Sequence, residues 1–450
     1  MFVLLSLQIN QIHEPISSSE PKYFDQRVDS FSQSPASMLK TFKQRYYINS
    51  DFLQQDIFTK AILYIGGEST LKSAKGGNVT DFDVLGVISK KYNAPIYALE
   101  HRFYGESQPF HGVEELKTEN LKLLSSRHAI ADIVNFVQKI DRQICKDLNL
   151  QYIPGKTCVA WVVAGGSYAG AVSAWLMQQH PGLFAGAISS SGVVDARFEI
   201  PEFDTQTYAA AGQPCAQAFV QAMRDIEHNQ ESFMEYFGTT GKNEQDFYYF
   251  LADASLMVFQ YGDWAKLCPK LISAYKLSQN VTPIFAEYMK NNFKFDSYDR
   301  EYLKNSPRDG HQRQWWYQTC TEVAYFQPAP LINNIRSQKV TTQWHLDICK
   351  YAFDLELNDP TQRTNQYYGV KEVYGPDTIF TNFWQDIWHI IGITKQSQNQ
   401  PNVEYIHCRD CAHCVDLHTI KESDPSELKQ LRQNVVDFIS NRFDNWDKSE

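Results

Sequence analysis

The chain has 450 residues with a formal net charge of −10, and 43% of them are hydrophobic and 14% aromatic. This length suits a large catalytic domain with an insertion better than one ordinary domain. Because the chain is acidic and has no basic cluster with interleaved aromatic residues, we expect neither nucleic acid nor a membrane as a partner.

The N-terminal region and the cysteines indicate the secretory route. Met1 to Leu7 form an apolar run that is too short to span a membrane but resembles a shortened signal peptide. Asn78 and Asn280 each begin a sequon for N-glycosylation. Nine cysteines spread along the chain favour disulfides, whose pairing the sequence leaves open, and their odd number leaves at least one thiol free or paired elsewhere. We expect a soluble glycoprotein in the lysosome or another acidic vesicle, or a secreted one.

The first part of the chain alternates strand and helix patterns. Alternation in Thr41 to Tyr47 predicts an early edge strand, and Ser125 or Ser126 caps a predicted amphipathic helix. Strands that alternate with helices predict a mostly parallel sheet with helices on both faces. Buried strands are predicted at residues 61–65, 95–99, 159–164 and 183–188, and helices at residues 82–90, 129–140 and 169–179.

The pattern changes after Asp195. Few strand-like runs occur in the next segment, which is rich in aromatic residues and contains helical patterns at residues 216–229 and 285–293. The expected domains are therefore a core made of residues 1–195 and 344–450, and a helical cap inserted at residues 196–343. Strand signals return at residues 378–381 and 403–406, and a closing amphipathic helix is predicted at residues 426–443.

A serine follows the strand predicted at residues 159–164. The sequence there is GGSYAG, with Ser167 at its centre, and a helical pattern begins at once. A strand, a tight turn with a central serine and a helix form the nucleophile elbow of the α/β-hydrolases, so we predict this fold. The turn requires small residues two before and two after the serine. These are Gly165 and Ala169, the latter in place of the usual second glycine.

The residues that would activate this serine come later in the chain. A serine hydroxyl needs a base, and the base needs an orienting partner. In this fold they follow the serine in the order Asp, His. Asp386 follows a late predicted strand and His413 follows the last one, so we predict Ser167, Asp386 and His413 as the catalytic residues. The rival histidines, which fit the order or the spacing less well, are His389, His407 and His418.

Main-chain N–H groups complete the expected site. The N–H groups of Tyr168, after the nucleophile, and of Gly67, after an early strand, are the expected oxyanion hole. The run Cys408-x-x-Cys411-x-x-Cys414 would also suit zinc. Because there is no second ligand knuckle elsewhere and His413 is assigned to the catalytic residues, we do not expect a zinc ion there.

Several segments resemble a family of serine peptidases. The segments are LYIGGE, ALEHRFYGES, GGSYAGAVSAW, WWYQTCTEVAYFQ, TNQYYG and AHCVDL, which occur in this order along nearly the whole chain. They resemble the serine carboxypeptidase family of lysosomal prolyl carboxypeptidase, dipeptidyl peptidase II and thymus-specific serine protease, and are most similar to the last branch. The resemblance implies an α/β-hydrolase core with a helical cap, and it places the nucleophile on Ser167, the acid on Asp386 and the base on His413.

The resemblance also implies a reaction. Members of the family cleave peptides after proline or another small residue, as exopeptidases, often at acidic pH and without a cofactor. We therefore expect a serine exopeptidase of the dipeptidyl-peptidase or Pro-Xaa carboxypeptidase type. Its expected partners are peptide substrates, and a homodimer is left open. Trp388 is expected to form an apolar wall of the substrate pocket, and Gln318 and Glu322 are expected to contact a substrate terminus.

One departure from the family pattern leaves alternatives. Near Asp386 this chain has Phe383 and Ile387 where relatives have glycine and proline. An inactive family member that serves as a binding protein is therefore an alternative. A lipase or esterase on the same fold is another.

Overall fold

An eight-stranded sheet forms the centre of the structure, a computed structural model that describes residues 20–54, 58–71, 83–112, 115–277, 279–305, 311–332 and 334–446. Met1 to Leu7 and Asn78 lie outside these residues, so the signal peptide and the first sequon stay predictions. The strands lie in the order β1-β2-β4-β3-β5-β6-β9-β10, and those from β4 to β10 are parallel. Their bounds are β1 Lys22–Arg27, β2 Thr41–Asn49, β3 Lys60–Ile65, β4 Ile96–Leu99, β5 Ala160–Gly166, β6 Gly186–Ser190, β9 Thr378–Phe383 and β10 Val403–Ile406.

The antiparallel side of the sheet differs from the sequence prediction. The predicted edge position of β2 is wrong, because β2 lies between β1 and β4 and is antiparallel to both. The edge strand is β1, in which exposed and buried side chains alternate from Phe24 to Arg27. Alternation along β2 indicates one buried face, but it does not tell whether one or two strands pair with it.

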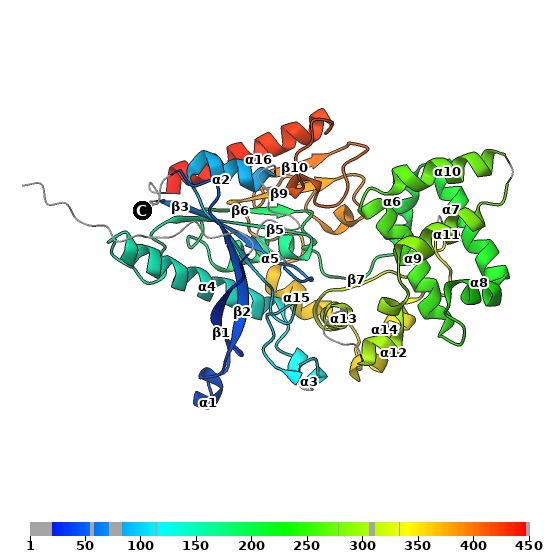
Figure 1. The fold of residues 1–450 in the computed structure, drawn as a ribbon, viewed down its shortest axis with the longest axis horizontal. Helices are drawn as coiled ribbons and strands as arrows, with labels where there is room; N and C mark the ends of the chain where they lie inside the picture. Colours follow the sequence, from blue (N-terminus) through cyan, green and yellow to red (C-terminus); the bar gives the residue numbers. More distant parts are fainter. Residues whose placement is uncertain are drawn as a thin grey trace, which may run out of the picture.

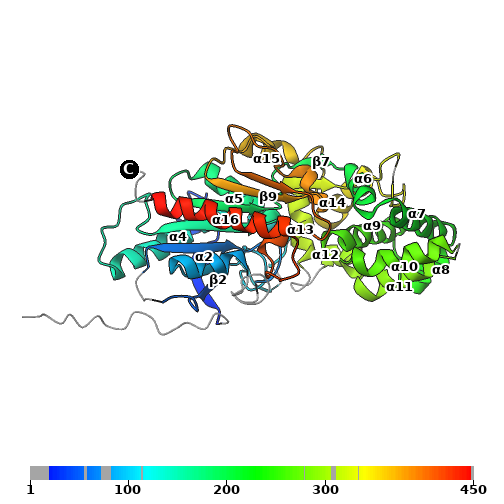
Figure 2. The same cartoon turned by 90° about the horizontal axis from the view of Figure 1, so that it is seen from above.

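Helices cover both faces of the sheet (Figures 1 and 2). Neighbouring residues of a strand point to opposite faces, as Val162 and Val163 of β5 do. Val162 belongs to the apolar cluster under α2 and α16, and Val163 belongs to the cluster under α4 and α5. This arrangement confirms the predicted α/β-hydrolase core. The helices are α2 (Val84–Tyr92), α4 (Ser126–Asp147), α5 (Tyr168–Gln179) and α16 (Ser426–Asn445).

A helical lobe lies beside the sheet, on the right of Figure 1. It comes from the chain between β6 and β9 and has its own apolar cluster, which includes Phe219, Phe247 and Trp344. Trp344 lies on α14, so this helix continues the lobe beyond the predicted boundary at residue 343. The helices of the lobe are α6 (Glu202–Ala211), α7 (Gln213–His228), α8 (Gln230–Phe237), α9 (Glu244–Gln260), α10 (Trp264–Lys276), α11 (Thr282–Asn292), α12 (Arg300–Asn305), α13 (Gln312–Gln318) and α14 (Thr342–Phe353).

The remaining elements are short. A small sheet pairs β7 with β8 in parallel and lies apart from the main sheet. Among the described residues, no helix has both the length and the apolar character needed to cross a membrane. The short elements are β7 (Arg197–Glu199), β8 (Ala324–Phe326), α1 (Pro35–Met38), α3 (Thr118–Leu121), α15 (Thr361–Tyr368), η2 (Asp296–Tyr298), η4 (Thr319–Val323), η5 (Ile387–Ile391) and η6 (Val415–Leu417).

Eight of the nine cysteines form disulfides, as expected for a protein of the secretory route. Cys414 is the free cysteine. The second sequon residue, Asn280, is exposed just before α11. The pairs are Cys145–Cys158, Cys215–Cys268, Cys320–Cys349 and Cys408–Cys411.

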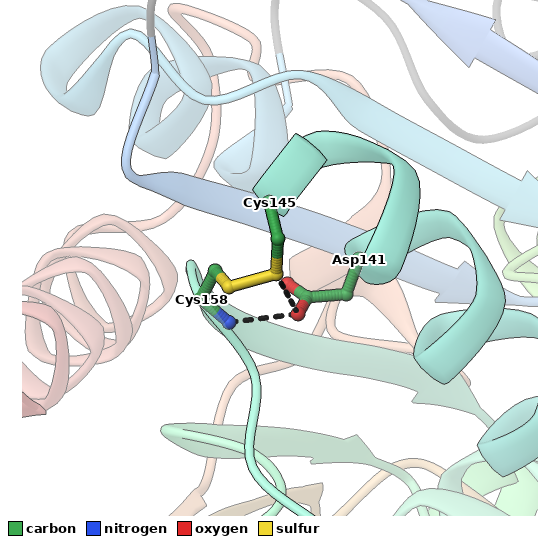
Figure 3. Close-up of side chains that lie close together, drawn as sticks. All are labelled: Asp141, Cys145 and Cys158. Carbon is green, nitrogen blue, oxygen red and sulfur yellow. Dashed lines mark hydrogen bonds between the residues drawn. A yellow bond between two sulfur atoms is a disulfide. The ribbon is translucent and has the colours of Figure 1, made fainter. Parts of the chain in front are cut away.

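Asp141 lies beside the first of these disulfides (Figure 3). Its carboxylate accepts the main-chain N–H of Cys158 at 2.7 Å and the indole N–H of Trp161 at 3.1 Å. Cys145 and Cys158 are joined to each other, so they offer no thiolate to a metal ion. The cluster therefore ties the end of α4 to the start of β5, the strand that leads to Ser167.

Candidate active site

Ser167 lies in a tight turn between β5 and α5. Its backbone has a φ of 59° and a ψ of −126°, a conformation that is costly for a residue with a Cβ. A Cβ on Gly165 would lie 2.2 Å from the carbonyl oxygen of Ala169, so only glycine fits there. A Cβ on Gly170 would lie 2.7 Å from the carbonyl oxygen of Ser190. The small residues of this segment thus let the chain reverse closely enough to present the serine at the end of β5.

Asp386 and His413 are hydrogen-bonded to each other beyond the last two parallel strands. Asp386 follows β9, and His413 follows its neighbour β10. Nδ1 of His413 donates to Oδ2 of Asp386 at 2.7 Å, and the two side chains are 5% and 0% exposed. The other carboxylate oxygen accepts the main-chain N–H of Trp388 at 3.0 Å. The carboxylate is therefore fixed on one side by the backbone and fixes the imidazole on the other.

The carboxylate also sets the proton affinity of His413. Burial lowers the pKa of the imidazole, but the charge of Asp386, followed by the contributions of Cys414 and of the hydrogen bond, raises this pKa well above its ordinary value. Since Nδ1 donates to Asp386, Nε2 carries the lone pair in the neutral imidazole. Nε2 is buried and makes no hydrogen bond to any described residue. An imidazole held in this way can accept a proton at Nε2.

The loop that carries His413 is held from two sides. The carboxylate of Asp416 accepts the hydroxyl of Ser190 and, at 2.7 Å, the hydroxyl of Thr381. Arg432 on α16 donates to the main-chain oxygen of Asp416 at 3.1 Å. These contacts join the loop to β6, β9 and α16, so the position of the imidazole is set by the sheet and not by the loop alone.

Ser167 and His413 line one cavity of about 470 Å³ between the sheet and the helical lobe. Trp388 also lines it, as the sequence predicts for an apolar wall, and its indole N–H donates to the side-chain oxygen of Gln260 at 2.9 Å. The main-chain oxygen of Gln260 accepts the N–H of His413 at 3.1 Å. Gln260 thus joins α9 of the lobe to the catalytic loop. No sequence signal marks this residue, because it ends an ordinary helix far from the motifs.

Gly67 and Tyr168 are the neighbours of Ser167 that could stabilise an oxyanion. Tyr168 is the first residue of α5, and the first N–H groups of a helix have no carbonyl partner within it. Gly67 follows β3 and lines the cavity. A Cβ on Gly67 would lie 3.7 Å from the Cβ of Ala169, which shows how closely this loop approaches the elbow.

Gln318 and Glu322 do not line this cavity. The side-chain oxygen of Gln318, which is fully buried, accepts the hydroxyl of Tyr104 at 2.6 Å. Glu322 accepts the main-chain N–H and the hydroxyl of Ser126, each at 2.9 Å, and so caps α4. The structure therefore assigns both side chains to the contact between core and lobe instead of to a substrate terminus.

The two residues that depart from the family pattern fill the core. Phe383, the last residue of β9, and Ile387 are both 0% exposed. Between them the Asp386 side chain still reaches His413. The departure therefore leaves the hydrogen-bonded pair intact.

The cysteine run beside His413 does not have the form of a zinc site. Cys408 and Cys411 form a disulfide, and oxidised cysteines offer no thiolate ligands. Cys414 remains as a thiol that lines the cavity. The zinc alternative therefore lacks two of its three sulfur ligands.

Known proteins share this sequence along most of its length. The profile of the family described as serine carboxypeptidase S28 matches residues 26–237 and 261–435. The "Probable serine protease EDA2" of Arabidopsis thaliana is 33% identical over 442 residues, which cover 93% of this chain and 87% of that protein. The mouse thymus-specific serine protease is 26% identical, with 96% and 89% covered, and the mouse lysosomal Pro-X carboxypeptidase is 24% identical, with 93% and 90% covered. The chain therefore belongs to the serine carboxypeptidase S28 family and is a serine-type peptidase.

Proposed function

We propose that this peptidase is an exopeptidase that hydrolyses short peptides after proline or another small residue. Ser167 attacks the carbonyl carbon of the scissile bond while Nε2 of His413 takes the hydroxyl proton. Asp386 holds the imidazole and stabilises its charge once it is protonated. The N–H groups of Tyr168 and Gly67 stabilise the oxyanion. His413 then gives the proton to the leaving amine, which departs and leaves an acyl group on Ser167.

Water completes the reaction. It attacks the acyl group on Ser167 and gives a proton to His413, and the collapse of the second tetrahedral intermediate returns the proton to the serine oxygen. The observation that carries the proposal is the 2.7 Å hydrogen bond between His413 and Asp386, with His413 and Ser167 lining the same cavity. This arrangement needs no metal ion to generate the nucleophile.

The size of the cavity and the names of the relatives support the substrate class. A cavity of about 470 Å³ holds a short peptide segment but not a folded chain. Trp388 and Tyr325 line it with apolar rings, against which a proline ring can pack. One relative is named a Pro-X carboxypeptidase. These features together favour a short substrate with proline or a small residue before the scissile bond.

We propose the secretory route, with the lysosome or the extracellular space as the destination. Four disulfides require an oxidising compartment during folding. Among the relatives are a lysosomal peptidase and a probable extracellular serine carboxypeptidase of Arthroderma benhamiae.

A digest of a peptide library tests the reaction. Intact protein is incubated with short peptides in mildly acidic and in neutral buffer, and the products are identified by mass spectrometry. We expect terminal fragments that end after proline or a small residue, and no products from the Ser167→Ala variant. Turnover of short acyl esters without cleavage of any peptide would contradict the proposal and favour the esterase alternative.

A further inference from the structure

Two carboxylates, and no lysine or arginine among the described residues, line the cavity that holds Ser167 and His413. The two carboxylates are those of Glu68 and Asp253. Burial lowers the pKa of His345 to about 3 and also lowers that of His418, so these two lining histidines add no positive charge at neutral pH. Away from His413, which is paired with Asp386, a terminal carboxylate of a substrate would meet no lysine or arginine, whereas an ammonium group would meet two carboxyl groups as acceptors.

Asp253 lies among aromatic rings that also line the cavity. The hydroxyl of Tyr298 donates to Oδ2 of Asp253 at 2.7 Å. The ring of Tyr249 lies 5.9 Å from that of Tyr298 and 5.7 Å from that of Trp316. Aromatic faces attract cations, and a carboxylate at their edge adds a formal charge. Three aromatic rings beside one carboxyl group, with no basic side chain among them, form a site that can bind an ammonium ion.

Arg336, whose charge acts on Asp253, is hydrogen-bonded to another acid. Arg336 is 1% exposed and does not line the cavity. Its Nε donates to Oδ1 of Asp204 at 2.6 Å, and its Nη1 donates to the main-chain oxygen of Gln327 at 2.7 Å. Burial raises the pKa of Asp253, and the hydrogen bond from Tyr298 and the charge of Arg336 oppose this rise. A bound ammonium ion would favour the charged carboxylate in the same way.

The distance from the reacting serine is suitable for a short fragment. Asp253 lies seven residues before Gln260 on α9, so the two share a face about 10 Å apart along the axis. Gln260 touches His413 through its main-chain oxygen. An extended peptide covers about 3.3–3.6 Å per residue, so two or three residues reach from the catalytic residues to Asp253.

We propose that Asp253, with the rings of Tyr249, Tyr298 and Trp316, binds the free α-amino group of the substrate, so that the enzyme releases short fragments from the amino end of peptides. This inference rests on the proposed exopeptidase function. It selects the amino-terminal mode of action over the carboxypeptidase mode.

Peptides with blocked ends test this inference on the intact protein. One proline-containing peptide is prepared in four forms, with a free or acetylated amino end and a free or amidated carboxyl end. We expect acetylation to lower kcat/KM on the order of 100-fold and amidation to change it less than about threefold. Loss of cleavage on amidation, with acetylated peptide still cleaved, would overturn the inference but leave the exopeptidase function standing. Cleavage of none of the four, together with no reaction of Ser167 with a fluorophosphonate, would refute the proposed function itself.

A substitution locates the effect at Asp253. Asp253→Asn keeps an acceptor for Tyr298 but removes the charge, and we expect kcat/KM for the free-amine peptide to fall roughly 10- to 100-fold, mainly through KM. Its rate of reaction with an uncharged fluorophosphonate should stay within about twofold of wild type. An unchanged kcat/KM, or an equal loss with the fluorophosphonate, would contradict the assignment. If the variant does not fold, the four peptide forms on wild type still decide the mode of action.

Asp225→Asn is the matched control. Asp225 is a partly buried aspartate of the same lobe whose Oδ2 also accepts one hydroxyl, that of Thr282 at 2.6 Å, but it does not line the cavity. We expect this variant to retain wild-type kcat/KM on the free-amine peptide. An equal loss in both variants would show a general effect on the lobe and overturn the role of Asp253.

Discussion

A single hydrogen bond orients His413, the base of the proposed mechanism. His413 can take the proton of Ser167 only when its own proton stays on Nδ1, and the Oδ2 atom of Asp386 holds it there at 2.7 Å. The same carboxylate raises the pKa of the imidazole. Asp386 therefore sets both the orientation and the basicity of the His413 imidazole, so a substitution of Asp386 should change both.

Asp386→Asn should change both the rate and its pH dependence. The neutral amide no longer favours the active tautomer or the charged imidazole, so we expect kcat to fall on the order of a thousandfold or more. Activity requires neutral His413, so it is lost as the pH falls through the pKa of this residue. Because Asp386 raises that pKa, its removal should move the acid limb of the kcat/KM profile to lower pH.

The pH profile of kcat/KM for wild type and variant measures this effect. Asp416→Asn is a useful comparison, since Asp416 holds the catalytic loop through Ser190 and Thr381 without touching the imidazole. It should lower activity without moving the acid limb. An acid limb that stays at the wild-type pH in Asp386→Asn would contradict the role given to Asp386.

At the scale of single residues, the sequence predicts Ser167, Asp386 and His413 as the catalytic residues. Each of them follows a predicted strand, and they occur in the order Ser, Asp, His that is known for this fold. The sequence does not predict which side chains of the lobe enter the cavity. Gln318 and Glu322 lie in a conspicuous motif but face the core, whereas Asp253 and Gln260 lie on a helix without any motif and line the cavity. The direction of a side chain in the lobe depends on how α9 and η4 pack, which local spacing does not encode.

At the scale of elements, α4 begins against the lobe at a partly buried acid, Glu322. Glu322 of η4 caps α4 through Ser126, and burial raises the pKa of Glu322 to about 7. The folded state thus holds a proton that the unfolded chain releases near pH 4.5. The stabilisation from this protonated acid is complete below that pH and is lost as the pH rises through about 7.

Glu322→Gln should flatten the pH dependence of stability. From about pH 4.5 to pH 8, we expect the free energy of unfolding of wild type to fall by about 1–2 kcal/mol more than that of the variant. This difference is smaller than the full pKa shift would give, because the Glu322 side chain is only partly buried and solvent screens it. Urea unfolding at the two pH values measures the difference. Glu119→Gln, an exposed acid of α3, serves as the control and should behave as wild type. An identical pH dependence in Glu322→Gln and wild type would contradict this account.

The sequence predicts most elements of the core because their apolar residues recur at the periods of strands and helices. The strand predicted at residues 159–164 is β5, and the helix predicted at residues 426–443 is α16. It misses β1, whose six residues contain a single strongly apolar side chain, Phe24, among buried polar ones such as Gln26. Pairing with β2 holds that strand, and the side chain of Gln26 donates to the main-chain oxygen of Asp132, a residue of α4 that lies 106 positions later in the chain.

At the scale of the whole molecule, the catalytic cavity belongs to neither part alone. The core supplies Ser167 and His413, and the lobe supplies Asp253, Tyr298 and the rings around them. Helices inserted between β6 and β9 thus close the open end of a sheet that would otherwise present its serine to solvent. Under the proposed mechanism, the lobe sets the length of the substrate and the end of it that is recognised, while the core supplies the reacting groups.

The most direct test of the central claim is the site and rate of reaction with a fluorophosphonate, read by mass spectrometry of the intact and digested protein. The account predicts one adduct per chain on Ser167 of the folded protein, with the reaction lost in His413→Ala and slowed in Asp386→Asn. No adduct on folded wild-type protein at acidic or neutral pH, or the same rate after the loss of His413, would contradict it.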